Sequence, residues 1–314
     1  MAGKRHGVAI LGVFVADVAF RARRQPEMGE TIIGSDFKLG PGGKGSNQSV
    51  AAARVGADVT FISKIGKDEF GAIALATWKK EGVKAKVIET TENPTGAAYI
   101  FVNDVTGDNA IIVVPGAGGA ITPADVDGAA QAIGNSAVFI TQLEQPVESA
   151  MRGLEIAKAA GVATVFNPAP AVAVEDAIYP LCDYVTPNEN EARLLSGMPV
   201  TSVDDARKAG DFFLKKGVGA ALITLGEAGA LLHTSSASTL IPAFNAGPVV
   251  ETTGAGDAFN GGFATALARG ATPQEAVRFG CAVAGISVTR PGTAPSMPNL
   301  SEVEALLAGS PHVR

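Results

Sequence analysis

Short apolar segments alternate with amphipathic segments along most of the chain. The apolar segments are rich in β-branched residues and are bounded by Gly, Pro or polar residues, as buried strands are. The segments between them repeat apolar residues every three or four positions, which predicts helices. The clearest strand candidates are VAILGVFVA (8–16), VTFISKIG (59–66), SAVFITQLE (136–144), ATVFNPAP (163–170) and AALITLGEAGALL (220–232). Such strands, separated by helices, predict an α/β fold with a mostly parallel central sheet that helices cover on both faces.

Two segments interrupt this alternation. Residues 18–39 contain no clear helix, and residues 95–114 consist of two apolar runs joined by a turn near TGD, which predicts a β-hairpin. We expect lid segments at approximately 15–39 and 95–114 to form a small β-sheet beside the main one, with apolar strands that a ligand or a second subunit covers. Because no repeat or linker is visible, residues 1–314 are predicted to form a single domain.

The charge and hydropathy of the chain exclude several classes of partner. Among 314 residues, 25 are basic and 31 acidic, the net charge is −6, and no long block carries one sign. We therefore expect neither nucleic acid nor an anionic membrane as a partner. No apolar stretch approaches the roughly 18 residues of a membrane span. The apolar N-terminal run is interrupted by Gly12 and closed by Asp17, which favours a buried strand over a signal peptide.

Cysteine and histidine are too sparse to support the chemistry that depends on them. Cys182 and Cys281 are the only cysteines, so each is predicted to be a buried, reduced thiol in a cytoplasmic protein. The three histidines, His6, His233 and His312, are widely separated in the sequence. Neither a histidine-based triad nor a His/Cys metal centre is expected.

The first glycine-rich stretch, GPGGKGSNQSVAAA (40–53), contains the pattern G-x-G-x-x-G, but its context excludes a dinucleotide site. That fingerprint follows the first strand directly, whereas here a lid-like segment intervenes. Lys44 is followed by Gly45 rather than Ser or Thr, which excludes a Walker A loop. Bare backbone beside Lys44 and Asn47 suits the binding of hydroxyl groups on a small polar ligand. The simpler alternative is a glycine turn with Ser46 as a helix N-cap.

The second glycine-rich stretch, TTGAGDAFNGGF (252–263), leads into a predicted helix. Unobstructed amides at a helix N-terminus attract negative charge, and here they are the amides of Gly254, Ala255 and Gly256. Asp257 at the edge of this anion hole could take a proton from an attacking hydroxyl while the amides stabilise a transferred phosphoryl group. If Asp257 only complemented the helix dipole, the pair Gly261–Gly262 would be unexplained, since each glycine destabilises a helix by about 1 kcal/mol relative to alanine.

These stretches resemble the two signatures of the ribokinase-like (PfkB) carbohydrate kinases. The signatures appear here as GGKGSN (42–47) and ETTGAGD (251–257). Further stretches follow in that family's order, namely QLEQPVES, NPAP, TPNENEA, LITLGEAG and TRPGTAPSMP. The resemblance spans nearly the whole chain, and the ordered set of motifs is far more specific than any one of them.

The resemblance implies a fold and an activity. The fold would be a Rossmann-like three-layer α/β/α sandwich with a small β-sheet lid, often shared across a homodimer. The activity would be ATP-dependent phosphorylation of a sugar hydroxymethyl group, here the 5-hydroxyl of ribose, with Mg²⁺ and possible K⁺ as cofactors. Another furanose or a nucleoside, such as 2-deoxyribose, fructose or an adenosine-like compound, stays open as the substrate. A catalytically silent sugar-binding regulator is the alternative from another functional class.

By position, the resemblance also implies roles for individual residues. Asp257 matches the catalytic base, and the amides of residues 254–256 match the anion hole. Sugar-contacting positions match Asp17, Gly43, Lys44, Asn47 and Glu144. Positions near the nucleotide and its magnesium ion match Asn188, Glu191, Thr224, Gly226 and Cys281.

Some of these residues have simpler explanations. Asp17 and Glu144 could be turn residues at strand ends. Asn188 and Glu191 could cap a helix that begins after Pro187. Cys281 could be an ordinary buried helix cysteine, so the sequence leaves both readings of each residue open.

Two departures from the family pattern concern the substrate and a monovalent ion. Val15 stands where ribokinase-like sequences usually carry an asparagine beside the sugar, which makes a substrate lacking one hydroxyl credible. Glu251 replaces the usual aspartate of a potassium site, and Pro291 alters the loop that completes it. The positions that match this site are Glu251, Thr253, Ser287, Arg290, Gly292 and Ser296.

Overall fold

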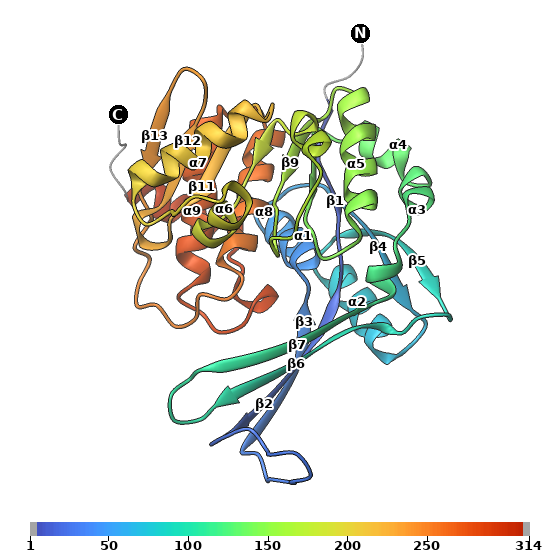
Figure 1. The fold of residues 1–314 in the computed structure, drawn as a ribbon. Helices are drawn as coiled ribbons and strands as arrows, with labels where there is room; N and C mark the ends of the chain where they lie inside the picture. The colour runs from blue at the N-terminus through green and yellow to red at the C-terminus, as the bar shows by residue number, and fades with distance from the viewer. Residues whose placement is uncertain (1–4, 310–314) are drawn as a thin grey trace.

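A nine-stranded sheet organises residues 5–309, the part of the chain that this computed structural model describes (Figure 1). His312 therefore lies outside the described residues. The strand order is β13-β12-β11-β10-β9-β8-β1-β4-β5, with parallel pairing from β5 to β11 and antiparallel pairing of β12 and β13. The bounds are β1 (Val8–Leu11), β4 (Val59–Gly66), β5 (Lys84–Thr90), β8 (Val138–Thr141), β9 (Ala163–Phe166), β10 (Tyr184–Val185), β11 (Ala220–Thr224), β12 (Ala230–His233) and β13 (Ser238–Ile241). The mostly parallel sheet expected from the sequence is confirmed.

Helices cover both faces of this sheet. Alternate residues of β1 enter different cores, with Val8 and Ile10 on one face and Ala9 and Leu11 on the other. The first face packs against α1 (Lys44–Arg54), α2 (Glu69–Lys80), α8 (Ala255–Ala268) and α9 (Pro273–Ser287). The second face packs against α3 (Pro123–Asp127), α4 (Ala130–Asn135), α5 (Val147–Ala159), α6 (Glu189–Ser196) and α7 (Val203–Lys215). The predicted three-layer α/β/α sandwich is confirmed.

The remaining helical segments are short or peripheral. Helix α10 (Leu300–Gly309) packs on α9 through Val303. The 3₁₀ turns are η1 (Ala117–Ala120), η2 (Asp176–Leu181), η3 (Gly226–Ala228) and η4 (Ala294–Ser296). Within residues 5–309, no helix has the length and apolarity needed to cross a bilayer.

Glycines let α8 approach its neighbours closely. A Cβ added at Gly261 would lie 2.6 Å from the Cβ of Ala51 and 2.7 Å from the carbonyl oxygen of Gln48, both on α1. A Cβ at Gly262 would lie 2.7 Å from Cγ2 of Val283 on α9. Since real side chains do not approach so closely, helix packing accounts directly for the pair Gly261–Gly262, which the sequence alone associated with the anion hole.

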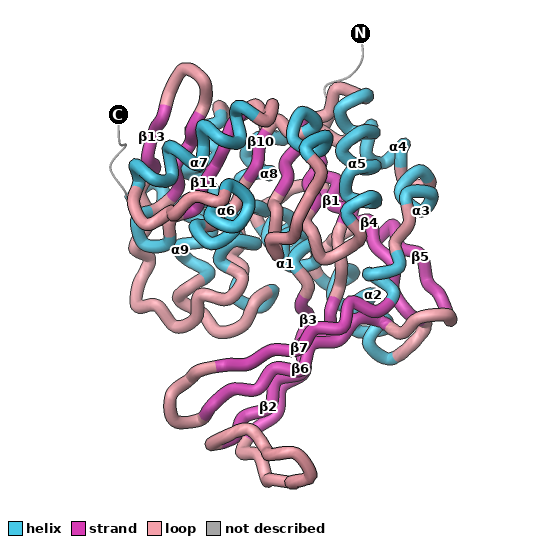
Figure 2. Tube along the Cα trace, in the orientation of Figure 1, coloured by secondary structure: helices cyan, strands magenta, loops and turns pink. Residues whose placement is uncertain are grey.

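A second, four-stranded sheet projects from the sandwich, as Figure 2 shows. Its order is β3-β2-β6-β7, with bounds β2 (Val15–Ala22), β3 (Asp36–Gly42), β6 (Thr95–Asn103) and β7 (Asn109–Gly116). Strands β6 and β7 form the predicted antiparallel hairpin, and β2 pairs in parallel with β6. Large apolar side chains on these strands are exposed, among them Phe20, Phe37, Ile112 and Val114.

The chain order around β1 creates a switch point. From β1 the chain adds β4 and β5 on one side, whereas β8 and the strands that follow extend the sheet on the other side. In open parallel sheets, ligands bind in the crevice beyond the carboxyl ends of the strands at such a point. Strand β2 starts at Val15, shortly after β1 ends at Leu11, so the small sheet begins beside this crevice.

Candidate active site

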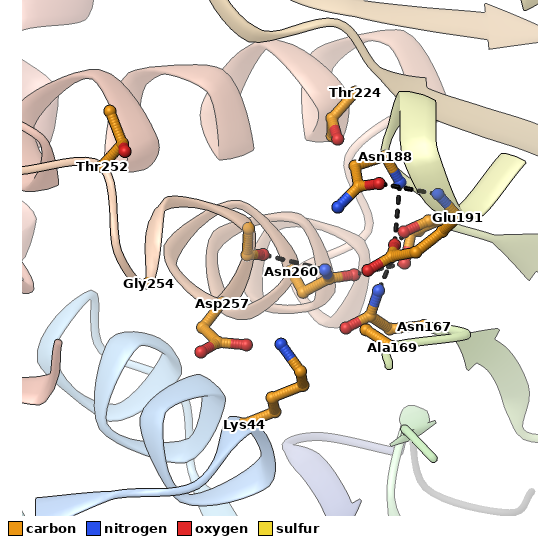
Figure 3. Close-up of a pocket in the computed structure, with 12 residues that line it drawn as sticks. Lys44, Asn167, Ala169, Asn188, Glu191, Thr224, Thr252, Gly254, Asp257 and Asn260 are labelled. Atoms are coloured by element: carbon orange, nitrogen blue, oxygen red, sulfur yellow. Dashed lines mark hydrogen bonds between the residues drawn. The ribbon is translucent and has the colours of Figure 1, made fainter. Parts of the chain in front are cut away.

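A cavity of about 210 Å³ lies at the carboxyl ends of the central strands, as Figure 3 shows in close-up. Its walls come from the start of α1, the loops after β9 and β10, the start of α6, the end of β11, and the start of α8 with the segment that leads into it. The lining residues are Lys44, Asn167, Ala169, Thr186, Asn188, Glu191, Thr224, Thr252, Gly254, Gly256, Asp257 and Asn260. The fold thus brings together both glycine-rich stretches and the NENE segment, which lie far apart in the sequence.

The first glycine-rich stretch turns sharply into α1. Gly43 has φ +87° and caps α1, and a Cβ there would overlap the carbonyl oxygen of Val13. A Cβ at Gly42 would overlap the carboxylate of Asp17, which therefore lies directly over this turn. The helix begins at Lys44, so the alternative in which Ser46 is the N-cap is wrong.

This turn also places Lys44 beside Glu144. The backbone amide of Lys44 donates a hydrogen bond to Oε2 of Glu144, with an N···O distance of 2.7 Å. Glu144 follows β8, the strand next to β1 on the other side of the switch point. Three predicted sugar-contacting residues, Asp17, Lys44 and Glu144, are therefore neighbours.

Asp257 lies buried in the first turn of α8. Gly254 caps this helix in the left-handed conformation, with φ +83°. Two amide donors from α1 hold the carboxylate, because Nδ2 of Asn47 lies 3.0 Å from Oδ2 and Nε2 of Gln48 lies 3.1 Å from Oδ1. The side chains of Asp257 and Lys44 point into the same cavity (Figure 3).

One of the three predicted anion-hole amides is already paired. The amide of Ala255 donates to the carbonyl oxygen of Thr252 at 3.1 Å, because the chain turns at Gly254 immediately before the helix. The expectation of an unobstructed amide at Ala255 is therefore wrong for this conformation. Gly254 and Gly256 both line the cavity.

The charges in this crevice perturb one another. Burial raises the pKa of Asp257, although Lys44 and the amides of Asn47 and Gln48 oppose the shift. Burial and the neighbouring carboxylate of Asp257 raise the pKa of Asp17 to about 6. Burial raises the pKa of Glu144 to about 7 despite Lys44. Burial lowers the pKa of Lys44, but the surrounding carboxylates outweigh this effect and raise it, so the ammonium stays charged.

Asn188 and Glu191 form a capping box at the start of α6. Oδ1 of Asn188 accepts from the amide of Glu191 at 2.8 Å, and Oε2 of Glu191 accepts from the amide of Asn188 at 2.9 Å. The capping interpretation is therefore confirmed. Both side chains also line the cavity, so capping and a role at the site are compatible.

Of the other three predicted nucleotide contacts, only Thr224 is among the cavity-lining residues. The backbone amide of Thr224 donates a hydrogen bond to the carbonyl oxygen of Pro187 at 3.0 Å. This bond joins the end of β11, where Thr224 lines the cavity, to the capped start of α6. Gly226 lies in the turn just beyond, with φ +51°. Cys281 is buried in the core beside α8, outside the cavity lining, and burial raises its pKa to about 12. The structure thus agrees with its alternative reading as a buried helix cysteine.

Most of the residues that match a potassium site already make hydrogen bonds or ion pairs within the protein. Oε2 of Glu251 accepts from the amide of Gly292 at 2.8 Å, which ties the two predicted segments together. The hydroxyls of Ser287 and Ser296 donate to carbonyl oxygens of their own turns, and Arg290 pairs with Glu302. Thr253 is exposed. Among residues 5–309, no group of three or more His, Cys, Asp or Glu side chains is placed to hold a metal ion.

No role was predicted from the sequence for a connected set of buried polar residues, three of which, Asn167, Thr186 and Asn260, also line the cavity. These residues are Gln48, Gln142, Asn167, Thr186 and Asn260. Their hydrogen bonds link α1 to the ends of β8, β9 and β10 and return to α8. The sequence did contain one indication of this network, because polar residues directly follow strand-like runs in QLEQP and NPAP.

Fold and site together define a class of protein. A buried carboxylate beside a lysine, at the glycine-capped start of a helix and at the switch point of a parallel sheet, is an arrangement suited to phosphoryl transfer onto a small polar acceptor. Residues 5–300 match the family described as pfkB family carbohydrate kinase. The chain belongs to this family and is an ATP-dependent sugar kinase.

Individual relatives are similar over nearly their whole length. A ribokinase of Haemophilus influenzae is 38% identical over 299 residues, covering 95% of this chain and 97% of the relative. A deoxyribokinase of Salmonella typhi is 34% identical over 303 residues, covering 96% and 98%. The structure of Arabidopsis thaliana ribokinase complexed with ribose and ATP has a TM-score of 0.93 and 29% identity, covering 98% of this chain and 100% of that one. The family resemblance and the fold class are confirmed.

Proposed function

We propose that this protein is a ribokinase, which transfers the γ-phosphoryl group of ATP to the 5-hydroxyl of ribose. The observation that carries the proposal is the buried Asp257 beside Lys44 in the cavity. The ribokinase relatives that match nearly the whole chain support ribose as the acceptor.

In this proposal, Asp257 is the general base. Its carboxylate takes the proton of the 5-hydroxyl, whose oxygen forms a bond to the γ-phosphorus while the bond from that phosphorus to the β,γ-bridging oxygen breaks. The backbone at Gly254 and Gly256, with the positive end of the α8 dipole, stabilises the charge on the migrating group. The ammonium group of Lys44 points into the same cavity as Asp257 and adds a positive charge there (Figure 3).

The polar groups around the first glycine-rich turn, beside the cavity, suit a sugar. Asp17 and Glu144 accept hydrogen bonds from ring hydroxyls, and Lys44 donates them. Oδ1 of Asn47 is buried with no hydrogen-bond partner, while its Nδ2 is held by Asp257. A buried amide oxygen without a partner favours the approach of a hydroxyl donor, so Asn47 also belongs to the sugar site.

Magnesium and ATP fit the opposite wall of the cavity. Mg²⁺ retains several waters and needs few protein oxygens, so the cavity-lining residues Asn188 and Glu191 would hold it through water. Thr224, which lines the cavity, and Gly226 in the turn just beyond it would approach the phosphates. Mg²⁺ bound there would neutralise charge on the transferred phosphate. We propose a potassium site beside Glu251 and Gly292, which are joined by the hydrogen bond described above. Equal rates in sodium and potassium buffers would contradict the potassium site.

The exposed apolar strands of the small sheet suit a second copy of the chain. Phe20, Phe37, Ile112 and Val114 are each more than two-fifths exposed. We propose that two copies of the chain form a homodimer through this sheet. Each chain contributes one catalytic domain, and the small sheet acts as a lid over the sugar. Light scattering that shows only monomer at micromolar concentration would contradict the dimer.

A specific observation favours 2-deoxyribose as a second candidate substrate. Val15 lies two residues before Asp17 on β2, so both side chains leave the same face of the strand. Val15 is buried with Val13 and Ala98 in an apolar cluster, which offers a sugar hydroxyl no partner. A deoxyribokinase is among the similar relatives.

Release of ADP with a panel of sugars and nucleosides tests the function. We expect turnover with ribose or 2-deoxyribose and loss of it in Asp257→Asn. Val15→Asn separates the two sugars, because a new amide donor should raise the preference for ribose by about 2- to 10-fold. Rapid turnover confined to a nucleoside or a hexose would refute the proposal.

A further inference from the structure

Gln48 connects the proposed base to the rest of the protein. It lies on α1, is fully buried, and its Nε2 donates both to Oδ1 of Asp257 at 3.1 Å and to Oδ1 of Asn167 at 3.0 Å. Its Oε1 accepts from Nε2 of Gln142 at 2.6 Å. One buried amide is therefore shared among the base and the ends of two parallel strands.

These contacts allow only one orientation of the Gln48 amide. If the amide were flipped, its oxygen would face two acceptor oxygens, those of Asp257 and Asn167, while its nitrogen would face the donor of Gln142. Asn167 is itself oriented, because its Nδ2 donates to the carbonyl oxygen of Thr186 at 2.9 Å. Gln142 is confined between Gly12 and Gly45, where an added Cβ would lie 2.5 and 2.9 Å from Oε1.

The same network returns to the helix that carries the base. The hydroxyl of Thr186 donates to Oδ1 of Asn260 at 2.7 Å, and Nδ2 of Asn260 donates to the carbonyl oxygen of Gly256 at 2.8 Å. Asp257 and the start of α8 are thus held from two sides by one set of buried hydrogen bonds. Buried networks in which each member is oriented by the next fix a single arrangement of their groups.

We propose that Gln48 is a positioning residue for phosphoryl transfer, which directs the carboxylate of Asp257 and favours its proton-accepting form, and that Gln142 acts through it by fixing the orientation of its amide. The inference rests on the proposed function of Asp257. It extends that function to two residues that touch neither the sugar nor the phosphates in the proposal.

The electrostatics around Asp257 explain why an amide donor matters. Lys44 on α1 is the cation that faces it, whereas Asp17 on β2, Glu144 after β8 and Glu191 on α6 are carboxylates that repel its negative charge. Burial further disfavours the charged form. Gln48 and Asn47 supply the neutral donors that oppose both effects.

The test compares pH profiles of kcat at saturating sugar and ATP, after wild-type turnover has established the reaction. In Gln48→Met, which keeps the side-chain length and removes the amide, we expect the acid limb to move up by about one pH unit. At pH values below this limb, kcat of the variant should then be about 10-fold lower than that of the wild type, and it should recover at pH values above the limb. The KM of the sugar should change by less than about 2-fold. Gln142→Met should shift the limb in the same direction but by less.

Gln145→Met is the matched control. Gln145 is also a buried glutamine after β8, but it donates to Thr141 and to the carbonyl oxygen of Gln142 rather than to the base. We expect a similar loss of thermal stability with the acid limb in its wild-type position. Should Gln48→Met fail to fold, Gln48→Glu keeps the shape of the side chain, and its added acid should move the limb further upward.

The outcomes separate the two levels of the proposal. An upward shift in the Gln48 and Gln142 variants, absent from Gln145→Met, would support positioning. An unshifted limb, or a loss of kcat that is equal at every pH, would overturn it even if the wild type phosphorylates ribose. Wild-type protein that phosphorylates no sugar would instead refute the proposed function.

Discussion

The affinity of the site for its sugar should depend steeply on pH, because two of the proposed sugar acceptors are carboxylates with raised pKa values. Burial, with the nearby charge of Asp257, raises the pKa of Asp17 to about 6. Burial raises the pKa of Glu144 to about 7. In the proposed complex both carboxylates accept hydrogen bonds from ring hydroxyls. Acidification should therefore lower kcat/KM for the sugar.

The size of the effect follows from these values. At pH 8 about 99% of Asp17 and about 91% of Glu144 is ionised, whereas at pH 5 the fractions are about 9% and about 1%. If binding needs both charges, kcat/KM falls about 1,000-fold between pH 8 and pH 5. A protonated carboxyl group keeps one acceptor oxygen, so this figure is an upper limit.

Initial rates of ADP release at sugar concentrations below KM, measured from pH 5 to pH 9, test this expectation. Burial also raises the pKa of Asp257, so Glu144→Gln is needed to assign the upper step to Glu144. We expect the variant to have a lower plateau and to lose the step near pH 7. A flat wild-type profile from pH 8 to pH 6, or a variant profile with an unchanged upper step, would refute the reasoning.

Three further predictions concern catalysis and stability. Asp257→Asn should lower kcat about 10²- to 10⁴-fold with little change in the KM of the sugar, as steady-state kinetics would show. The pKa of Glu144 in the folded protein lies above its usual value of 4.5, so its contribution to stability is complete below pH 4.5 and is lost as pH rises through 7. Glu144→Gln should therefore raise the unfolding free energy at pH 8 by at most about 3 kcal/mol and leave it unchanged near pH 4. Urea unfolding at the two pH values would show this difference. Gly261→Ala, whose Cβ would meet Ala51, should lower the unfolding free energy by about 1 to 3 kcal/mol, whereas Gly309→Ala, with open space around it, should change it by less than about 1 kcal/mol.

The sequence was sufficient for elements whose pattern is local. Buried strands such as Val8–Leu11 are apolar on both faces, and this pattern alone predicts a parallel sheet between helix layers. The hairpin at β6 and β7 was recognisable because two apolar runs flank a turn. Glycines at 43 and 254 were informative because both need a positive φ at a helix start.

Features that depend on long-range contacts were not accessible in this way. Gln48 and Gln142 are 94 positions apart, and nothing local in either segment indicates that their amides meet. The paired amide of Ala255 depends on the path of a turn rather than on residue type. Cys281 was placed near the nucleotide by resemblance, yet its helix directs it into the core.

Gly261 shows how helix packing and the proposed catalytic site are joined in this fold. The close approach of α8 to α1 is permitted by the absence of a side chain at Gly261, and one of the atoms that a Cβ would strike is the carbonyl oxygen of Gln48 itself. The same approach delivers the amides of Asn47 and Gln48 to Asp257. A methyl group at position 261 would push α1 away from α8 and lengthen both hydrogen bonds to Asp257. The glycine lies one helical turn beyond Asp257, outside the cavity lining, and yet it sets the distance on which the orientation of the Asp257 carboxylate depends.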